Sequence, residues 1–468
     1  MRTLVWFRGK DLRVADHVPL WTAAQRGEVA ALFVLDPYFF LPRRARRLPH
    51  RMQFLLESID SLRKNLNSLG LDLLLVSGPS VRVVPEVASR LGIERVLAQR
   101  WVEPFGQERD RRVAEALDVP FELHEGETLH PLGTLRSTSG SPYETYTPFA
   151  NALQKHLRVG DPLAVPKALR PLHHDVPSER LPTLADLGIQ ENPRLIRGGE
   201  RAARERLSAF SKEGLADYAL ARDRVDQPGT SRLSADLKFG TLSPRTVYRA
   251  ALARGGPGAE RFIAELIWRE FTHSTLCDRP ELLERAFRPS YDRGSWLDGS
   301  PAASAWKSGQ TGIPIVDAAS RQLLQEGFVH NRARMIAASF LTKHLRQHYR
   351  VGEGHYLRYL IDGDWAQNNF GWQWSAGCGV GAQPYFRVMN PVAQAEKFDP
   401  EGTYVRSWVP ELRRLEVKFV HQPWLAPPLA LEVAGVRLGE TYPYPVVELK
   451  AARAHYLDIA NQSFKQAR

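Results

Sequence analysis

Residues 361–374 carry the sequence IDGDWAQNNFGWQW, and this stretch decides how the rest of the chain is interpreted. The stretch contains two aspartates, Asp362 and Asp364. They are followed by a pair of asparagines and by three tryptophans. If the segment is helical after the aspartates, Asp364, Asn368 and Trp372 recur every four residues and share one face. An ordinary core helix would present leucine or alanine there. The pattern therefore predicts either a polar helix end with aromatic packing or a ligand site.

The composition bounds the class of protein. The chain has 468 residues, of which 43% are hydrophobic and 25% charged, as is usual for a globular enzyme of more than one domain. The formal net charge is +11 at pH 7. A basic excess of this size favours a polyanionic partner such as nucleic acid, although a solvated arginine-rich surface would give the same charge.

Two cysteines, Cys277 and Cys378, are too few for a disulfide scaffold and lack the spacing of a metal site, so we expect no bound metal. No apolar run reaches the length of a membrane span. The opening residues MRTLVWF fit a strand better than a secretory leader. We expect a cytoplasmic protein without membrane contact.

Short apolar runs alternate with helical patterns over residues 1–130, which predicts a parallel, doubly wound α/β sheet. Ligands of such sheets bind beyond the carboxyl ends of the strands, where Arg8, Asp11, Arg13 and Asp36 follow the first two runs. No GxGxxG motif follows the first run, so a standard dinucleotide site is not expected there. The expected strands are Thr3–Arg8, Val29–Pro37, Leu71–Gly78 and Arg95–Gln99, and the expected helices include Arg51–Leu66 and Val81–Leu91.

A basic run follows the second expected strand. Arg43, Arg44, Arg46 and Arg47 fall within five residues. We interpret the run as a solvated loop, with contact to a phosphate or a chromophore as the alternative.

Residues 131–199 are expected to form an irregular linker, because six prolines interrupt residues 162–193. From residue 200 to residue 468 the periodicity is helical and strand signals are weak, which predicts an all-α domain. Ser243 followed by Pro244 fits a helix N-cap. The expected helices are Glu200–Phe210, Pro244–Ala253, Glu260–Cys277, Ile315–Glu326, Asn331–Arg346 and Gly354–Leu360.

Several helical segments carry polar groups at positions expected to be buried. Thr230–Ser234 (TSRLS) can either cap a helix or cradle a pyrophosphate with its hydroxyls, backbone N–H groups and guanidinium. In ERFIAELIWREF, Glu265, Trp268 and Arg269 fall on one helical face, where the carboxylate can bond a base or nucleotide on which the tryptophan stacks.

The segment VHNRARM, residues 329–335, also carries polar groups at positions expected to be buried. It places Asn331, Arg334 and Met335 three and four residues apart. Arg334 can pair with Asp362 of the opening stretch, provided that the buried pair has its full set of hydrogen bonds.

Six motifs in a fixed order resemble the DNA photolyase/cryptochrome family, most of all its class I cyclobutane pyrimidine dimer photolyases. The opening WFRGKDLR also resembles the first strand of that family. The resemblance covers essentially the whole chain and implies an α/β antenna domain over 1–130, a linker over 131–199 and a helical FAD-binding catalytic domain over 200–468. The motifs are TSRLS at 230–234, ELIWREF at 265–271, GIPIVDAASRQL at 312–323, HNRARM at 330–335, DGDWAQNNFGWQW at 362–374 and PYFRVMNP at 384–391.

The resemblance implies a set of FAD contacts. Asn368 would lie beside flavin N5, where many photoreceptor cryptochromes carry aspartate or cysteine, so the asparagine favours repair. The implied contacts are Tyr218, Thr230, Ser231, Arg232, Leu233, Ser234, Glu265, Trp268, Asn331, Arg334, Asp362, Asp364 and Asn368.

The resemblance also implies the substrate side. Photolyases extrude their target from the duplex. The resemblance implies that enzymes for (6-4) lesions carry a histidine pair at the positions of Asn331 and Met335. This chain has neither histidine, and His330 is one residue away from the required position. The implied contacts to a flipped dimer are Glu265, Trp268, Asn331, Met335 and Trp374, and Arg222 and Arg332 would hold the flanking phosphates.

The expected activity is that of a deoxyribodipyrimidine photolyase, a carbon–carbon lyase. Photoexcited reduced FAD would pass an electron to the dimer in UV-damaged DNA, and the ring would open. We expect a cytoplasmic, nucleoid-associated monomer. The alternatives are a cryptochrome-like blue-light photoreceptor without repair activity, which the absence of a long C-terminal tail argues against, and a (6-4) photolyase.

Three features depart from the family pattern. The flavin-reducing relay usually has three tryptophans, and here Trp372 and Trp296 would flank Tyr349, which either relays an electron slowly or only packs, with Trp365 as a substitute. Gly381 stands where aspartate is frequent. Residues 101–112 (WVEPFGQERDRR) lack the Asn-Glu pattern of folate binding, so a second antenna chromophore can be a deazaflavin, another flavin, a folate bound otherwise, or absent.

Overall fold

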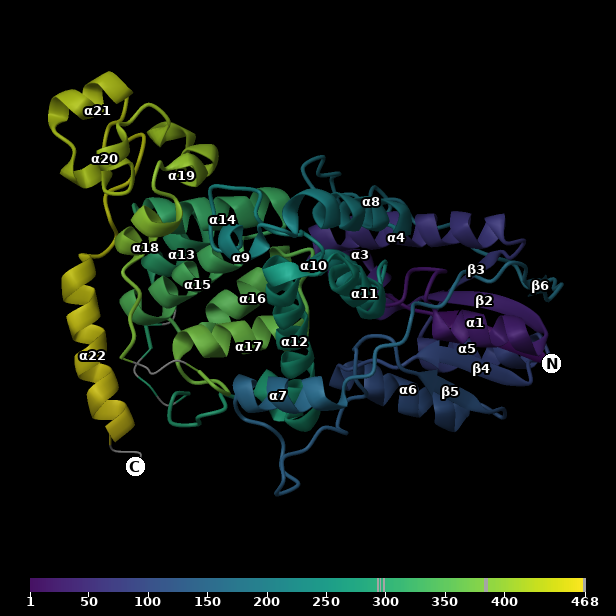
Figure 1. Cartoon of the computed structure of the whole chain (residues 1–468). Helices are drawn as coiled ribbons and strands as arrows, with labels where there is room; N and C mark the ends of the chain where they lie inside the picture. The colour runs from purple at the N-terminus through teal and green to yellow at the C-terminus, as the bar shows by residue number, and fades with distance from the viewer. Residues whose placement is uncertain (293, 295, 298, 383–385, 466–468) are drawn as a thin grey trace. The chain divides into compact units, whose positions relative to one another are not determined.

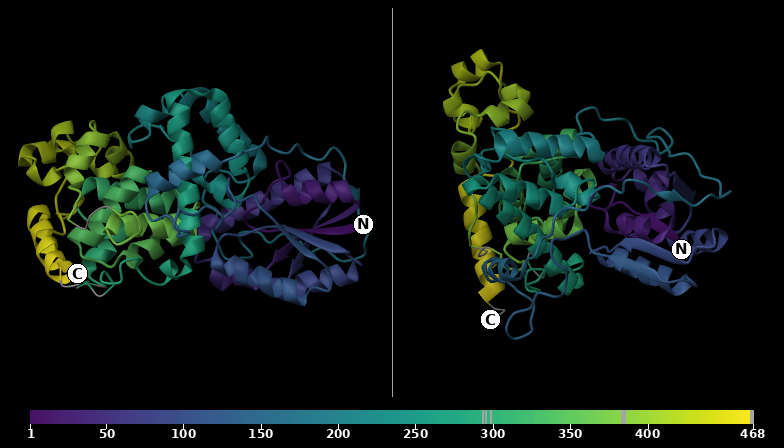
Figure 2. Two further views of the ribbon diagram at one scale, coloured as in Figure 1. Left: turned by 60° about the horizontal axis from the view of Figure 1, so that its bottom comes forward. Right: turned by 45° about the vertical axis from the view of Figure 1, so that its right-hand side comes forward.

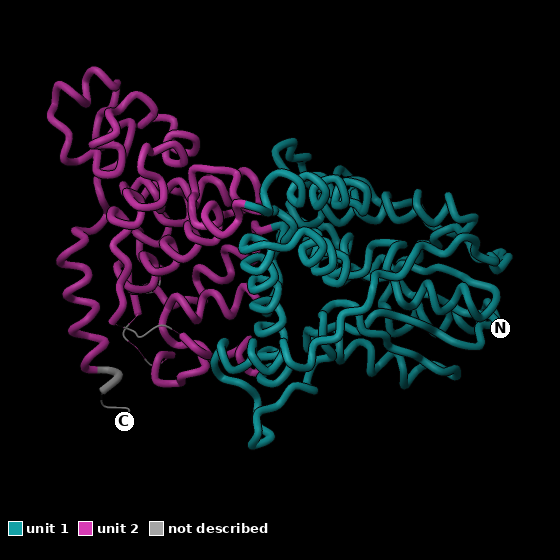
Figure 3. Tube along the Cα trace, in the orientation of Figure 1, with its two compact units in different colours: residues 1–216, 231–280, 361–366 teal, residues 217–230, 281–360, 367–468 magenta. Residues whose placement is uncertain are grey.

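The computed structural model describes every residue except 293, 295, 298, 383–385 and 466–468. The chain divides into two compact units (Figure 3). Unit 1 comprises residues 1–216, 231–280 and 361–366, and unit 2 comprises residues 217–230, 281–360 and 367–468. Because the chain passes between the units several times, the predicted domain limits 1–130, 131–199 and 200–468 are not read from this division and stay a prediction.

A parallel sheet forms the centre of unit 1, with strand order β3-β2-β1-β4-β5 and a short sixth strand beside the start of β2 (Figure 1, Figure 2). The four predicted strands are confirmed, and β5 and β6 were not predicted. The strands are β1 Arg2–Phe7, β2 Glu28–Leu35, β3 Leu73–Ser77, β4 Arg95–Gln99, β5 Phe121–His124 and β6 Arg170–Pro171.

Helices cover both faces of the sheet, which is why β1 and β2 are almost entirely apolar after their first residues. On one face, Val5 and Phe7 of β1 pack in a core with helices α1 and α4. On the other face, Leu4 and Trp6 pack in a core with helices α5 and α6. The predicted doubly wound α/β fold is confirmed. These helices are α1 Val18–Arg26, α4 Pro49–Ser68, α5 Ser80–Arg90 and α6 Pro104–Ala116, and the short α2 Pro37–Phe40 and α3 Pro42–Ala45 follow β2.

Unit 1 continues with helices from the later part of the chain. Helix α7 lies within the region predicted as linker, where Phe149, Ala150 and Leu153 give it a buried face. The predicted N-cap Ser243 is confirmed, because its Oγ accepts a hydrogen bond from the Thr246 N–H at 2.9 Å. The elements are α7 Tyr146–His156, α8 Glu200–Ala209, the π-helical segment Phe210–Gly214, α10 Ser234–Phe239, α11 Pro244–Arg254 and α12 Gly256–Asp278.

The regular elements described in unit 2 are helices, as predicted for this part of the chain, apart from an isolated bridge between Leu438 and Tyr442. The predicted helix over 331–346 is interrupted, because α15 passes into a π-helical segment, Phe340–His344. Helix α17 begins with the last two residues of unit 1 and continues in unit 2. The helices are α9 Tyr218–Ala221, α13 Pro301–Ser308, α14 Pro314–Glu326, α15 Asn331–Ser339, α16 Tyr349–Tyr359, α17 Trp365–Ala376, α18 Pro391–Phe398, α19 Thr403–Trp408, α20 Val417–Val420, α21 Pro428–Ala434 and α22 Leu449–Lys465, with 3₁₀ turns at Pro280–Leu283, Pro410–Leu412 and Pro423–Leu425.

Among the described residues, none of the helices has both the length and the apolar composition that crossing a membrane requires.

Candidate functional site

The stretch that opened the sequence analysis forms a turn and a helix. Asp364 is buried and directly precedes α17, and Asn368 and Trp372 lie inside that helix. Asn368 is half-buried and Trp372 is buried. The predicted helix is therefore present. Asn368 and Trp372 lie within it, and Asp364 is the residue immediately before it.

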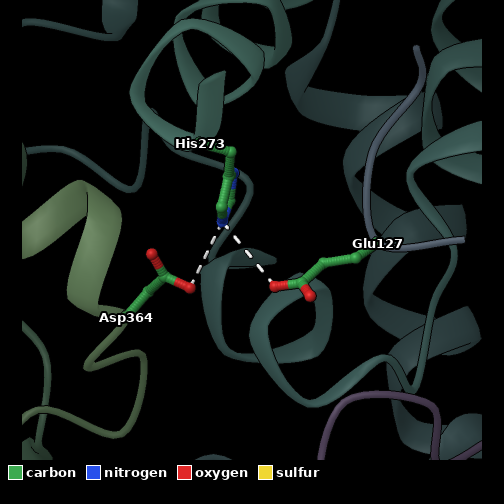
Figure 4. A group of neighbouring side chains, drawn as sticks. All are labelled: Glu127, His273 and Asp364. Carbon is green, nitrogen blue, oxygen red and sulfur yellow. Dashed lines mark hydrogen bonds and ion pairs between the residues drawn. The ribbon is translucent and has the colours of Figure 1, made fainter. Parts of the chain in front are cut away.

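Unit 1 fixes the turn at residues 362–364 from three sides. Arg51 of α4 donates a hydrogen bond to the carbonyl of Gly363 at 3.1 Å. The Asp364 carboxylate accepts from Nζ of Lys10, which follows β1, and contacts Nε2 of His273 in α12, each at 3.4 Å (Figure 4 shows the histidine contact). Lys10, Arg51 and His273 were not singled out from the sequence, because no local pattern reports contacts between positions so far apart.

Glu127, His273 and Asp364 each have an atom that could bind a metal ion, and these atoms lie within 4.8 Å of one another (Figure 4). The ammonium of Lys10 already bonds Glu127 and Asp364, and thus occupies the place that a cation would take. The expectation that the protein has no metal stays a prediction.

Helix α12 presents Glu265 and Trp268, both half-buried. The Trp268 ring stacks on the ring of Tyr146 in α7, with centroids 3.7 Å apart and an angle of 2° between the planes. Tyr146 donates its own hydroxyl to the carbonyl of Ala264 at 2.9 Å. One face of Trp268 is therefore covered by the protein.

Glu265 and Arg269 differ in what they contact. Glu265 forms an ion pair with Arg261 at 2.7 Å, one helical turn earlier. Arg269 is buried and donates to the carbonyls of Glu127, at 2.6 Å, and Leu237, at 3.5 Å. The guanidinium of Arg269 therefore binds backbone carbonyls, although the residue follows Trp268 directly in the helix.

The loop at residues 230–234 has the donors that a pyrophosphate requires. Arg232 adopts a left-handed conformation, with φ of 57°. Leu233 is buried, so only its backbone can face a ligand. Among the described residues, no hydrogen bond engages the hydroxyl of Thr230 or Ser234, and both residues are half-buried. These hydroxyls and the Arg232 guanidinium are groups of the kind that bind phosphate oxygens.

In unit 2, Asn331 and Met335 lie side by side at the start of α15, with Nδ2 3.8 Å from Sδ. Asn331 is exposed and Met335 is half-buried. His330 is buried and caps the same helix, since its Nδ1 accepts a hydrogen bond from the Arg332 N–H at 3.1 Å. Burial lowers the pKa of His330 to about 4, so the ring is neutral near pH 7. It is not available as an acid.

The two arginines expected to hold phosphates already share a carboxylate. Asp223 lies 2.8 Å from Nη2 of Arg332 and 3.9 Å from Nη1 of Arg222. A phosphate would have to share these guanidinium groups with Asp223. Arg334 donates to the carbonyl of Val329 at 2.7 Å, and its predicted pair with Asp362 stays a prediction because the two residues belong to different units.

The two adjacent asparagines of α17 have different roles. Asn369 is buried and donates to Leu282 O at 2.9 Å and to Glu353 Oε1 at 2.8 Å. Asn368 donates its Nδ2 to the carbonyl of Glu353 at 3.1 Å. Because this bond directs the nitrogen of Asn368 to the protein, its oxygen is the atom left to accept a hydrogen bond from a ligand.

The predicted relay residues lie in unit 2. The Trp372 ring contacts the rings of Tyr356 and Trp306, with centroids 5.1 and 5.9 Å apart. Tyr349 is buried, and among the described residues its hydroxyl has no hydrogen-bond partner. Burial also raises the pKa of Tyr349. Trp296 contacts Tyr291 at 4.6 Å, and Tyr291 lies 6.4 Å from Tyr349, centroid to centroid.

The remaining predicted residues are placed as follows. Tyr218 is buried at the start of α9, and Trp374 is half-buried. Gly381 adopts φ of 57°, a conformation that glycine takes without strain. In the motif PYFRVMNP, Pro384 and Tyr385 lie outside the described residues, and Asn390 caps α18 through the N–H of Val392 at 3.0 Å.

The segment that departs from the folate pattern packs within unit 1. The buried ring of Trp101 has the guanidinium of Arg109 4.4 Å from its centroid. Nearby in sequence, the exposed ring of Phe105 stacks on Tyr38 with centroids 4.3 Å apart, and Arg44 of the basic run lies 4.6 Å from the Tyr38 ring. Arg44 is thus an aromatic contact rather than only a solvated charge.

Comparison with known families agrees with these observations. Residues 3–168 match the family model described as DNA photolyase, and residues 262–462 match the model described as the FAD binding domain of DNA photolyase. The deoxyribodipyrimidine photo-lyase of Agrobacterium fabrum is 38% identical over 97% of this chain and 96% of its own length. A deoxyribodipyrimidine photo-lyase of Thermus thermophilus is 39% identical over 98% of both chains.

Solved structures give the same result. A bacterial class III photolyase from Agrobacterium tumefaciens matches with a TM-score of 0.92 and 37% identity, over 99% of this chain and 98% of that one. The Synechocystis cryptochrome matches with a TM-score of 0.90 and 29% identity, over 98% and 99% of the two chains. An archaeal photolyase from Sulfolobus tokodaii with two FAD molecules matches with a TM-score of 0.83 and 29% identity, over 100% of both chains. The chain belongs to the DNA photolyase/cryptochrome family.

Proposed function

We propose that this protein repairs cyclobutane pyrimidine dimers in UV-damaged DNA with the energy of light. The observation that carries the proposal is the pair at the start of α15, where the Asn331 amide and the Met335 thioether lie 3.8 Å apart. An amide can bond a pyrimidine edge, and a thioether can pack against its apolar ring. The neutral, capping His330 offers no acid for a (6-4) lesion.

The cofactor would be FAD. When bound in its fully reduced form, FAD supplies an electron after absorbing light and takes it back, so that the two carbon–carbon bonds of the cyclobutane ring break without net oxidation. The residues proposed to contact FAD are Tyr218, Thr230, Ser231, Arg232, Leu233, Ser234, Glu265, Trp268, Asn331, Arg334, Asp362, Asp364 and Asn368.

The residues of the chain would bind and orient rather than react. The hydroxyls of Thr230 and Ser234 and the Arg232 guanidinium would hold the phosphates. The free side-chain oxygen of Asn368 would accept a hydrogen bond at the flavin. Glu265 would bond the dimer, and the Trp268 and Trp374 rings would each offer it an apolar contact.

DNA would bind chiefly through its phosphates, in keeping with the net charge of +11. Arg222 and Arg332 would contact the phosphates beside the lesion in exchange for part of their contact with Asp223. We infer that the protein acts as a cytoplasmic, nucleoid-associated monomer, which size-exclusion chromatography with light scattering would test.

A second antenna chromophore would bind in unit 1. The stacked and exposed rings of Tyr38 and Phe105, with Arg44 beside them, offer a planar anionic chromophore an aromatic surface and a charge. The absorption spectrum of the purified protein, compared with that of a Phe105→Ala variant, would test this place.

The deciding experiment illuminates the purified, reduced protein with blue light in the presence of oligonucleotides that carry either a single cyclobutane thymine dimer or a single (6-4) lesion. Loss of the dimer in light but not in darkness supports the proposal. Loss of the (6-4) lesion alone would assign the protein to that class of enzyme. Bound flavin without repair of either lesion would favour the photoreceptor, and failure to bind flavin would overturn the proposal.

A further inference from the structure

Unit 1 contains a buried cluster of charges of which only Asp364 has a part in the proposed function. Lys10, which follows β1, places its Nζ 3.0 Å from Glu103 and 3.4 Å from Asp364, and it also bonds Glu127. The four side chains are at most 10% exposed. One ammonium group therefore joins three carboxylates that come from distant parts of the chain.

His273 of α12 contacts two of the same carboxylates. Its Nδ1 lies 2.9 Å from the carbonyl of Arg269, and its Nε2 lies 3.4 Å from Asp364 and 3.8 Å from Glu127 (Figure 4). Oxygen atoms therefore face both ring nitrogens of His273. Asp364 is thus in contact with two basic side chains, Lys10 and His273.

The surroundings of Lys10 differ from those of a second buried lysine. Lys343 in unit 2 is buried and donates to the carbonyl of Arg387 at 2.8 Å, and its burial lowers its pKa to about 7. Burial acts on Lys10 in the same direction, but the charges of Glu103, Glu127 and Asp364 outweigh it and raise the pKa of Lys10. The three carboxylates therefore stabilise the charged form of Lys10, although burial alone would favour the neutral form.

We propose that Lys10 and His273 are positioning residues that keep Asp364 ionised and fixed in orientation at the start of α17, so that its carboxylate accepts a hydrogen bond from FAD. This inference rests on the proposed function, because it assumes that Asp364 contacts FAD. It assigns to a loop after the first strand of the sheet a part in setting the strength of cofactor binding.

The balance of charge around Asp364 predicts what removal of Lys10 would do. Although burial opposes ionisation, the His273 and Lys10 charges keep the pKa of Asp364 well below its usual range. Without Lys10, Asp364 would lose one of the cations that lower its pKa, so its pKa would rise and proton uptake by this carboxylate would become more favourable. The charged and titratable groups around Asp364 are Lys10, Arg51, Glu103, Glu127, Lys238, Arg269, His273 and Asp362.

The test measures FAD dissociation from the holoprotein between pH 6 and pH 8, by flavin fluorescence. The variant Lys10→Met removes the charge and nearly keeps the volume. Lys10→Arg keeps the charge, and Lys343→Met removes a buried lysine that bonds no carboxylate. Loss of a charge-assisted hydrogen bond corresponds to an affinity change of about tenfold or more.

We expect the FAD dissociation constant of Lys10→Met to rise about tenfold from pH 8 to pH 6, with little change in the wild type, Lys10→Arg and Lys343→Met. Combining Lys10→Met with Asp364→Asn should abolish this pH dependence, because the titrating carboxylate is gone. A purely structural role would lower thermal stability and FAD affinity equally at both pH values, and that result would overturn the inference.

If Lys10→Met does not fold, His273→Gln answers the same question, because glutamine can still donate to Asp364 but carries no charge. A pH-independent dissociation constant in that variant would likewise overturn the inference. The proposed function fails separately, since it requires the wild type to bind FAD and to repair dimers. A wild type that does both, with Lys10→Met unchanged, would reject only the role of Lys10.

Discussion

Tyr442→Phe offers a measurable test of how unit 2 is held together. Tyr442 is buried and its hydroxyl donates a hydrogen bond to Oδ2 of Asp317 at 2.7 Å. Asp317 belongs to the motif GIPIVDAASRQL. Asp317 is also buried and accepts from the N–H and hydroxyl of Thr311, both at 2.7 Å, and from the N–H of Gly312 at 3.0 Å. The carboxylate therefore joins the C-terminal segment to the start of α14.

The magnitude follows from these contacts. A hydrogen bond to a charged group contributes about 1.5–3 kcal/mol. Because Oδ2 of Asp317 keeps the Gly312 N–H after the hydroxyl is removed, no buried oxygen is left unpaired. We therefore expect Tyr442→Phe to lower the free energy of unfolding by about 1.5 kcal/mol, the lower end of that range, at pH 8.

The effect should depend on pH. Burial raises the pKa of Asp317 to about 6, although its hydrogen bonds oppose the rise. Since the folded pKa lies above the unfolded value of about 3.9, this carboxyl's contribution to stability is full below about pH 4 and is lost as the pH rises through about 6. The Tyr442 hydroxyl stabilises the ionised form, so its removal should cost about 1 kcal/mol or less at pH 5, where the bond is between neutral groups.

The assay is equilibrium urea unfolding of the holoprotein at pH 5 and pH 8, followed by far-UV circular dichroism. Tyr444→Phe is the matched control, because Tyr444 is two residues away and 60% exposed. Equal losses for Tyr442→Phe at the two pH values would refute the reasoning about Asp317. A loss no larger than that of Tyr444→Phe would refute the hydrogen bond itself.

Further changes test the proposed site directly. Asn331→Ala should slow repair of the cyclobutane dimer with FAD still bound, and loss of the flavin from this variant would contradict its placement on the substrate side. Arg332→Ala should weaken binding to damaged and undamaged DNA alike and reduce the salt slope by about 1, whereas a selective loss for damaged DNA would point to a lesion contact. Tyr349→Trp should speed photoreduction of oxidised enzyme, because the buried phenol has no partner among the described residues to take its proton, and an unchanged rate would exclude this position from the relay.

Much of the fold was predictable because its signals are local. The apolar runs of β1 to β4 and the helical periods of α4, α5 and α12 each lie within a short window. Strand β5 was not predicted because its four residues, FELH, are only half-buried and include a charged side chain. Helix α7 was absorbed into the predicted linker, although the spacing of Phe149 and Leu153 was a usable helical signal.

The candidate site was predictable only in part. Residue type and spacing indicated Asn331 with Met335, and the aspartate before α17. The same reasoning did not single out Lys10, Glu127 and His273, nor the Tyr146 ring on Trp268, because these contacts join positions at least 91 residues apart. Nothing within a short window distinguishes a lysine that will pair with three carboxylates from one that stays in solvent.

The link between Lys10 and Asp364 has a consequence for how the protein is made. The two residues are 354 positions apart, yet they belong to the same buried cluster of unit 1. At about 5–20 residues per second, the ribosome adds Asp364 roughly 20–70 s after Lys10. During that interval the sheet can form, but Lys10 lacks one of its three carboxylates. The emerging chain therefore cannot complete this cluster until more than three quarters of it has been synthesised, and the proposed contact of Asp364 with FAD would make cofactor capture a late event in its biogenesis.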